Sequence, residues 1–328
     1  MKPLQIINVG DWYYRTDLRV PGLGGSRRKV VMKRTPDGRA EFMIKTFERS
    51  VGELRSEVIA SNLAAAIEIP AQSVAFCDIP QYAVLQLTSP SGVCSKLFLR
   101  TREGRLEGLV HGLELLTRSV PTYNATKNRP QDYNLDTIYF ALKQYGDSHG
   151  MTREIVNSFF EMVCFDALIG GTDRHHWNWA VIEKGGAFVR FAPLFDHGIS
   201  LLWDIDTPGK YQRVISHSLG MQLHKAPSRI RVTSTRNGSL YDVVSVVGQW
   251  KEVDPYVIER LYDNINDLTR GEKMRHAVVD KLDRVPPQFL GGSRDPLEWV
   301  YKYTELRRIK LLEILDALRP TPTLQWMR

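Results

Sequence analysis

Residues 171–179 read G-T-D-R-H-H-W-N-W, and residues 195–198 read F-D-H-G. They supply a lone aspartate, Asp173, an asparagine five positions later, Asn178, and a second aspartate near a glycine, Asp196. Metal-assisted phosphoryl transfer uses such a set, because one carboxylate accepts the proton of the attacking hydroxyl while other oxygens hold Mg²⁺ against the nucleotide phosphates. The pattern predicts an ATP-dependent kinase with Asp173 as the base and Asn178 and Asp196 as metal ligands.

The composition is that of an ordinary globular protein. The chain has 328 residues, of which 43% are hydrophobic and 25% charged, and a net charge of +7 that favours phosphate-bearing or acidic partners. No apolar run approaches the roughly 20 residues of a membrane span, and the start has no apolar core typical of a standard secretory signal. Three widely spaced cysteines disfavour a disulfide framework. A cytoplasmic location fits best, and a secreted effector would need a non-standard export route.

Features of the first ninety residues add to the kinase pattern. Glycines in residues 22–26 precede a predicted strand, where their amides can close over phosphates, although such glycines can also form a simple turn. Lys45 lies mid-strand between apolar neighbours, and Glu57 on the following predicted helix is placed to pair with it. The order of these features before Asp173 is harder to obtain by chance than any one of them.

Hydrophobic periodicity predicts two parts of different character. Up to residue 90 it indicates strands at 28–33, 41–47, 73–77 and 81–87, with one helix at 52–67. After a T-S-P-S-G break at 88–92 it indicates helices at 133–146, 152–170, 255–269 and 296–318, with a hairpin at 179–191. We therefore expect an α+β, two-lobed, protein-kinase-like fold, with a small β-rich N-lobe (1–90) and a larger, mainly helical C-lobe (91–328).

The aromatic and imidazole side chains of the central stretch have other interpretations. His175, His176 and Asp173, joined by His197, are a less favoured transition-metal site, because they lack helical ligand spacing and the oxygen ligands suit magnesium better. The tryptophans of this stretch are interpreted as packing anchors.

The two stretches in context resemble a known family. Residues 169–182 (I-G-G-T-D-R-H-H-W-N-W-A-V-I) and 192–201 (A-P-L-F-D-H-G-I-S-L) are similar to HipA-like bacterial serine/threonine kinases, closest to the compact HipT and CtkA types. The D-R-H-x-x-N core is also distantly similar to phosphatidylinositol 3- and 4-kinases. The resemblance implies ATP and Mg²⁺ as cofactors, a protein substrate, and for some members a toxin role with an antitoxin partner.

The same resemblance implies roles for single residues. Asp173, Asn178 and Asp196 would be catalytic, Asn178 and Asp196 would hold the metal, and Leu85 to Leu87 would form the hinge strand whose main chain binds adenine. Ser26 matches a serine that is autophosphorylated in relatives, and its alternative is a turn serine bonded to its own backbone. The implied nucleotide contacts are Gly24, Gly25, Ser26, Lys29, Lys45, Glu57, Leu85, Leu87, His175, Asn178 and Asp196.

Two other functions fit the sequence less well. The same catalytic groups would serve a lipid or small-molecule kinase. A non-catalytic basic module that binds nucleic acid or a protein partner would use Arg229, Arg231 and Arg236 in S-R-I-R-V-T-S-T-R. No recognised nucleic-acid motif accompanies these arginines, which disfavours nucleic-acid binding by this segment alone.

Overall fold

A computed structural model of the protein describes residues 6–14, 29–35, 41–99, 101–102, 105–123, 130–207, 209–216, 227–291 and 295–320. The predicted glycine-rich loop, with Gly24, Gly25 and the candidate phosphorylation site Ser26, lies outside the described residues. Within them, no helix is both long and apolar enough to cross a membrane.

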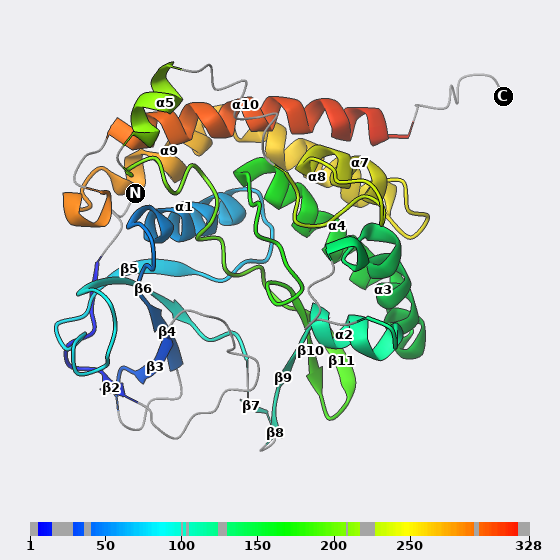
Figure 1. The fold of residues 1–328 in the computed structure, drawn as a ribbon, viewed down its shortest axis with the longest axis horizontal. Coiled ribbons are helices and arrows are strands. Elements are labelled where there is room, and N and C mark those ends of the chain that lie inside the picture. The colour runs from blue at the N-terminus through cyan, green and yellow to red at the C-terminus, as the bar shows by residue number, and fades with distance from the viewer. Residues whose placement is uncertain are drawn as a thin grey trace.

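The N-terminal part is built on a six-stranded sheet (Figure 1). Its strands, in spatial order, are β1 (Ile7–Asn8), β5 (Val74–Asp78), β6 (Ser91–Lys96), β4 (Glu41–Lys45), β3 (Lys29–Lys33) and β2 (Tyr13–Tyr14). Only β1 and β5 pair in parallel, and the other pairs are antiparallel. The strands expected at 28–33, 41–47 and 73–77 are confirmed.

The two faces of this sheet follow from the alternation of its side chains. Phe76 and Val93 face helix α1 (Gly52–Ala66), while Cys77 and Cys94 belong to a separate apolar cluster on the other face. Helix α1 lies between the sheet and helix α9 (Figure 1). The sheet therefore presents one face to the main core of the molecule, and that face also receives Lys45.

The strand predicted at 81–87 is wrong. These residues form successive turns, and Gln86 has φ 55°, a left-handed value that a strand cannot contain. Leu85 and Leu87 are buried in the apolar cluster with the cysteines. The alternation of apolar residues at 81–87 therefore comes from turns that pack on a sheet, and not from a strand.

The predicted boundary at residue 90 would cut this sheet, since β6 lies between β5 and β4. Of the T-S-P-S-G break, residues 88–90 lead into β6, and Ser91 and Gly92 are already its first two residues. We propose that the two lobes join after Lys96 instead.

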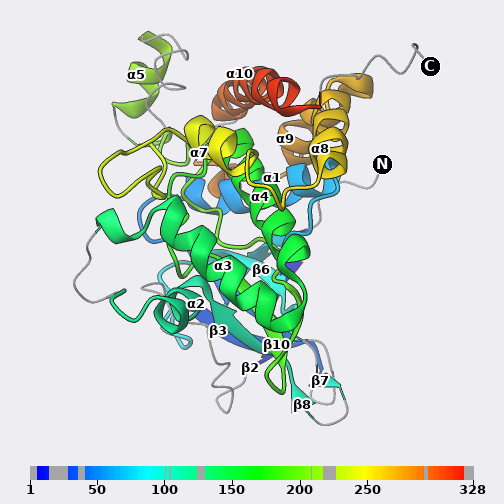
Figure 2. The same cartoon turned by 90° about the vertical axis from the view of Figure 1, so that its right-hand side faces the viewer.

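The rest of the chain is mainly helical, and a small second sheet lies at one end of it (Figure 2). This sheet has the order β11 (Ala187–Phe191), β10 (Ala180–Lys184), β9 (Gly108–His111), and a hairpin of β7 (Thr101–Arg102) and β8 (Arg105–Leu106) precedes it. The helices are α2 (Gly112–Ser119), α3 (Leu135–His149), α4 (Thr152–Ile169), α5 (Lys210–Ser216), α7 (Leu240–Val247), α8 (Pro255–Asp267), α9 (Lys273–Val278) and α10 (Asp295–Leu318). The described residues also form the short 3-10 helices η1 (Pro130–Asp132), η2 (Arg270–Glu272), η3 (Asp280–Leu282) and η4 (Pro287–Phe289).

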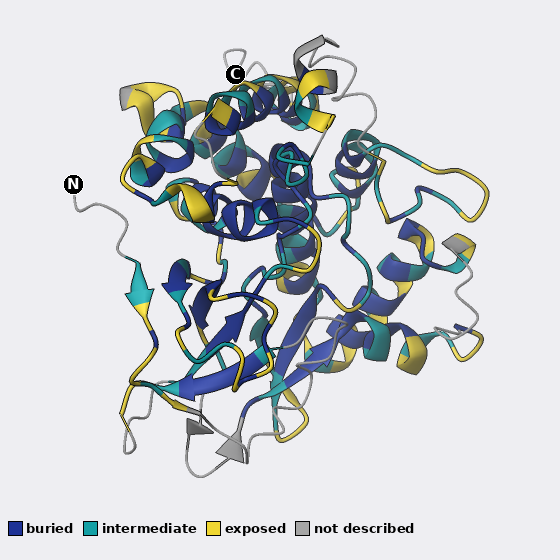
Figure 3. Cartoon of the chain, turned by 60° about the vertical axis from the view of Figure 1, so that its left-hand side comes forward, coloured by how far each residue is buried: buried dark blue, intermediate teal, exposed yellow. Residues whose placement is uncertain are grey.

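One core joins the two parts. Helix α4 is largely buried, and it packs against α3, α7, α8 and α10. Buried residues gather where the helices meet one another and the six-stranded sheet (Figure 3). The same core continues through α1 to the inner face of the six-stranded sheet. The site described next lies at this junction, where α1, the end of α4 and the β10–β11 hairpin meet.

Candidate active site

The loop between α4 and β10 carries Asp173 and Asn178. It begins at Gly170, which ends α4 in a left-handed conformation with φ 67°. Its main chain then folds back on itself, because the amide of His175 donates to the Asp173 carbonyl at 2.8 Å and that of Asn178 donates to the His175 carbonyl at 2.8 Å. The Asn178 Nδ2 also donates to the Asp173 carbonyl, at 2.9 Å. These bonds hold Asp173 and Asn178 in one compact turn.

The glycine that starts this loop offers a stability test. We expect Gly170→Ala to lower the free energy of unfolding more than Gly150→Ala, although both glycines end helices with nearly equal φ (67° and 68°). A Cβ at Gly150 meets nothing within 4 Å, so only the left-handed backbone opposes it, at about 1–2 kcal/mol. A Cβ at Gly170 would also overlap the Tyr303 hydroxyl, adding about 1–3 kcal/mol. Urea denaturation of both variants measures the difference, and equal losses would contradict the predicted overlap.

A buried arginine ties the loop to its surroundings. The Arg174 Nε and Nη2 donate to the two carboxylate oxygens of Asp166 on α4, at 2.8 and 2.7 Å. Its Nη1 donates to the carbonyls of Asn178 and of Phe195, the latter at 3.1 Å. Burial opposes the charge of Arg174, but the Asp166 carboxylate, together with Tyr133 and Asp196, raises the pKa of Arg174 overall. One side chain therefore connects α4, the loop and the residue before Asp196.

A second network starts from the six-stranded sheet. Lys45 pairs in register with Val93, so its side chain lies on the α1 face, where it forms an ion pair with Glu57. Both side chains are buried. The Lys45 Nζ also lies 3.3 Å from an Asp196 carboxylate oxygen, and Asp196 has φ 61°. The predicted pairing of Lys45 with Glu57 is thus present, and Lys29 lies opposite Lys45 on the neighbouring strand.

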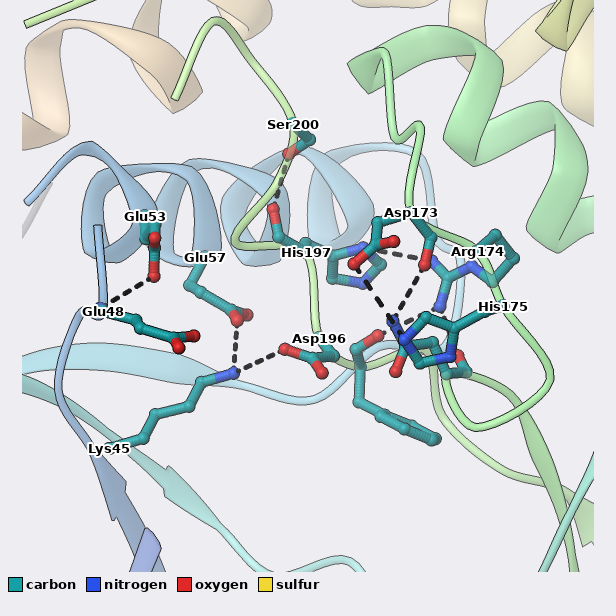
Figure 4. A network of polar contacts seen from close by, with 12 residues as sticks. Lys45, Glu48, Glu53, Glu57, Asp173, Arg174, His175, Asp196, His197 and Ser200 are labelled. Carbon is teal, nitrogen blue, oxygen red and sulfur yellow. Dashed lines mark hydrogen bonds and ion pairs between the residues drawn. The ribbon is translucent and has the colours of Figure 1, made fainter. Parts of the chain in front are cut away.

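Figure 4 shows Asp196 between these two networks, with Lys45 and Glu57 on one side and Asp173 with His175 on the other. The Asp173 side chain is 33% exposed and its carboxylate lies 4.0 Å from the His175 Nε2. Burial lowers the pKa of His175, although Asp173 and Asp196 oppose this shift. The site therefore holds two carboxylates that solvent reaches, a buried lysine and an imidazole that is neutral at neutral pH.

The histidine-rich metal site is not formed. Among the described residues, no three His, Cys, Asp or Glu side chains come together in a way that could hold a metal. The His176 Nδ1 is 2.9 Å from the Tyr123 hydroxyl, and burial lowers its pKa to about 4. The buried His197 accepts a bond from the Arg174 Nη2 at 3.3 Å. These rings order the loop rather than forming a ligand set.

The two tryptophans of the loop differ. The Trp179 ring is buried, and its Nε1 donates to the Tyr133 hydroxyl at 2.9 Å. That hydroxyl in turn donates to the Arg174 carbonyl at 3.0 Å. Trp179 is thus the predicted packing anchor, whereas Trp177 is 42% exposed.

The predicted hinge is not supported. The amides of Leu85 and Leu87 donate to the carbonyls of Gln81 and Tyr82, at 3.1 and 2.8 Å. These donors are used within the turns, so they are not available to a nucleotide base. The strand expected here was inferred from alternation alone.

The arginines proposed for nucleic-acid binding do not act together. The Arg231 Nη1 donates to Asn237 at 2.5 Å, and the Arg236 Nη2 lies 3.4 Å from Asp242. Arg229 is exposed, and its charge helps to lower the pKa of His175. Of these three arginines, Arg229 is therefore the one whose charge affects a side chain of the loop that carries Asp173.

Sequence reasoning missed the residues that hold the site together, namely Tyr133, Asp166 and the supporting role of Arg174. An available signal was the lone aspartate in the apolar run M-V-C-F-D-A-L-I (162–169), since a charge in a fully buried helix requires a partner. Arg174, eight positions later, supplies it.

Comparison with known proteins identifies the family of this chain. The model of the HipA-like C-terminal domain matches residues 22–239. The chain belongs to the HipA-like C-terminal domain family. The resemblance inferred from the sequence is confirmed. No curated protein matches this HipA-like chain.

Two solved structures share the fold. The Helicobacter pylori proinflammatory kinase CtkA is 18% identical with a TM-score of 0.71, over 95% of this chain and 97% of CtkA. HipA of Shewanella oneidensis MR-1, solved with HipB and operator DNA, is 11% identical with a TM-score of 0.54, over 98% of this chain and 68% of HipA. At these identities the likeness establishes the fold, so the predicted α+β, kinase-like architecture is confirmed.

Proposed function

We propose that this HipA-like protein is an ATP-dependent serine/threonine protein kinase that transfers the γ-phosphoryl group to a hydroxyl with Mg²⁺. The observation that carries the proposal is Lys45, held between Glu57 and Asp196 beside the loop of Asp173 and Asn178. Phosphoryl transfer depends mainly on positioning and on neutralising phosphate charge, and this network supplies both.

Lys45 is the group we assign to the nucleotide phosphates. Its partner Glu57 holds the ammonium extended from β4, and Lys29 adds a second positive charge opposite it in the sheet. The glycine-rich residues before β3, with Gly24, Gly25 and Ser26, complete the phosphate site in this proposal. Ser26 is its autophosphorylation candidate.

Adenine would be bound by the main chain that leaves β6, at Phe98 and Leu99, in place of Leu85 to Leu87. The Leu97 amide is not included, because it donates to the Glu41 carbonyl at 2.9 Å. This segment joins the two lobes in our division of the chain. Phe98 and Leu99 pack with Ala180, Ile182 and Phe195 in a small apolar cluster beside Asp196. An apolar wall next to the phosphate-binding groups suits a nucleotide base.

The donor set fits Mg²⁺. Because the Asn178 Nδ2 donates to the Asp173 carbonyl, the Asn178 Oδ1 is the atom left to face a cation, and Asp196 adds a carboxylate. Mg²⁺ is commonly held by one or two such oxygens together with phosphates and water. When bound, the ion would neutralise charge on the phosphates. Asp173, which is partly exposed, would accept the proton of the acceptor hydroxyl.

For the cellular role, we propose toxin-type growth inhibition in the cytoplasm, with an antitoxin partner. The support is the HipA structure, which contains HipB, and the three cysteines of this chain, which are buried free thiols. Arg229 beside the catalytic loop supports an acceptor that carries negative charge.

The test is incubation with γ-labelled ATP and Mg²⁺, followed by intact mass and peptide mapping, with a bacterial extract and phosphoinositide vesicles as separate acceptors. We expect added phosphate on this chain, at Ser26 in the first instance, and on extract protein but not on lipid. Label on lipid alone would replace a protein kinase by a lipid kinase. No ATP turnover with any acceptor would contradict the proposal.

The metal assignment gives a sharper prediction. Excess EDTA should abolish transfer. Asp196→Asn should lower the rate of transfer by roughly a hundred-fold or more, because the Mg²⁺ that neutralises the transition-state charge would lose an anionic ligand. Raising Mg²⁺ should recover part of the Asp196→Asn rate. The matched control is Asp204→Asn, a partly exposed acid on the same segment, which should transfer at the wild-type rate. Equal rates for both variants would exclude Asp196 as a metal ligand.

A further inference from the structure

The segment that follows Asp196 lies directly against the N-terminal half of α1. The Ser56 hydroxyl donates to the Ser200 carbonyl at 2.8 Å, and the Arg55 Nη2 donates to the Leu202 carbonyl at 3.3 Å. A Cβ on Gly52 would overlap the Trp203 carbonyl, so only glycine permits this approach. Three backbone groups of the segment therefore face one helix.

A buried ion pair closes this contact. The Arg55 Nη1 lies 2.5 Å from an Asp206 carboxylate oxygen, and the Arg55 and Asp206 side chains are 0% and 8% exposed. The two residues are 151 positions apart, so the pair exists only in the folded chain. It fixes where the far end of the segment meets α1.

The pair is costly for the fold. Burial lowers the pKa of Arg55 and raises that of Asp206, in each case against the influence of the partner. Among the described side chains, the Arg55 Nε is a buried donor with no acceptor. Leu201 and Leu202 have φ of 52° and 55°, values that are strained for residues other than glycine. Buried ion pairs are poor sources of stability, so this arrangement calls for another reason.

Helix α1 also carries a residue of the candidate active site, which gives the Arg55–Asp206 ion pair a role other than stability. Glu57 is on the same helix, two positions after Arg55, and it pairs with Lys45. Lys45 in turn contacts Asp196, where the segment begins. The chain thus forms a closed circuit from Asp196 to Asp206, to Arg55, and back through Glu57 and Lys45. A shift of the segment would move Glu57 relative to the two groups assigned to ATP and metal.

We propose that Arg55 and Asp206 are positioning residues, which form a clasp that sets the place of α1 and so holds Glu57 against Lys45 for phosphoryl transfer. The proposal rests on the proposed kinase function. It predicts that the directional ion pair serves activity, whereas the burial of the two side chains serves stability.

Three variants separate these effects. Asp206→Asn removes the charge at nearly constant volume. Arg55→Met combined with Asp206→Leu replaces the pair by apolar side chains, an exchange that often preserves or raises stability in buried ion pairs. Asp136→Asn is the control, because it makes the same chemical change at an exposed position in the first turn of α3. Each variant is assayed for melting temperature, for kcat and KM of ATP-dependent transfer, and for hydrogen exchange along α1.

We expect Asp206→Asn to lower kcat about ten-fold or more, with KM for ATP within about three-fold, and to speed exchange of the α1 amides at 52–57 about ten-fold. The double variant should melt at or above the wild-type temperature yet keep the low kcat. A double variant that regains wild-type kcat together with stability would overturn the clasp, because packing alone would then suffice. Unchanged exchange in α1 of Asp206→Asn would also overturn it.

The exchange measurement keeps the two proposals distinguishable. If the wild-type protein transfers no phosphate, the proposed function fails, yet faster exchange at 52–57 in Asp206→Asn would still report that the clasp holds α1. If the wild type is active and Asp206→Asn has wild-type kcat, the clasp fails alone.

Discussion

Asp173→Asn is expected to lower the rate of phosphoryl transfer about a thousand-fold while leaving ATP affinity and melting temperature close to those of the wild type. A positioned general base contributes roughly 10²–10⁴ to a rate, and asparagine cannot accept the proton. The fold is spared because the loop is held by the Asp173 carbonyl, which accepts bonds from His175 and Asn178, and not by its carboxylate. That carboxylate is one-third exposed, and the His175 Nε2 lies 4.0 Å from it.

The measurement is single-turnover transfer from γ-labelled ATP at saturating nucleotide, with ATP affinity obtained separately by calorimetry. Asp136→Asn is the control, since it makes the same chemical change at an exposed position in the first turn of α3. Both variants should bind ATP with wild-type affinity, and only Asp173→Asn should lose transfer. Undiminished transfer in Asp173→Asn would remove Asp173 from the mechanism and leave the metal groups without a base.

The elements that the sequence predicted correctly are those whose signals are local. The ion pair of Lys45 with Glu57 follows from a lysine between apolar neighbours on one strand and a glutamate on the next helix. The β10–β11 hairpin follows from alternation on either side of Gly185 and Gly186. In each case the interacting residues are close in sequence, so their spacing along the chain is enough to predict that they come together.

The elements that were missed or wrong depend on distant parts of the chain. Arg55 and Asp206 are 151 positions apart, and nothing near either residue indicates that both are buried. Asp166 lies in an apolar helix, which indicates that it is buried and paired, but only the fold shows that its partner is Arg174. The false strand at 81–87 arose because Leu85 and Leu87 pack on a sheet from a series of turns. Alternating apolar residues indicate which side chains are buried, but the same alternation occurs in strands and in turns that pack on a sheet.

Arg174→Met is expected to lower the free energy of unfolding by about 3–5 kcal/mol at neutral pH, the usual cost of leaving one partner of a buried ion pair alone. Asp166 is 2% exposed, and both of its carboxylate oxygens accept bonds from Arg174. Transfer should fall with stability, because Arg174 also bonds the Asn178 and Phe195 carbonyls and so fixes the residues assigned to the metal. Arg174→Lys, the matched control, keeps the charge without the two-pronged geometry, so it should lose less stability than Arg174→Met.

The pH dependence of the stability loss in Arg174→Met tests whether the loss comes from the unpaired Asp166 carboxylate. Burial raises the pKa of Asp166, and Arg174 lowers it, so Arg174→Met should raise this pKa further. A carboxyl whose folded pKa exceeds its unfolded value binds its proton more tightly in the folded state, so the penalty is fully present above the folded pKa and shrinks as the pH falls through it. Urea denaturation at neutral and at mildly acidic pH should therefore show the gap between wild type and Arg174→Met narrowing on acidification. A gap that stays constant would mean that the loss comes from altered packing around the substituted side chain rather than from an unpaired Asp166 charge.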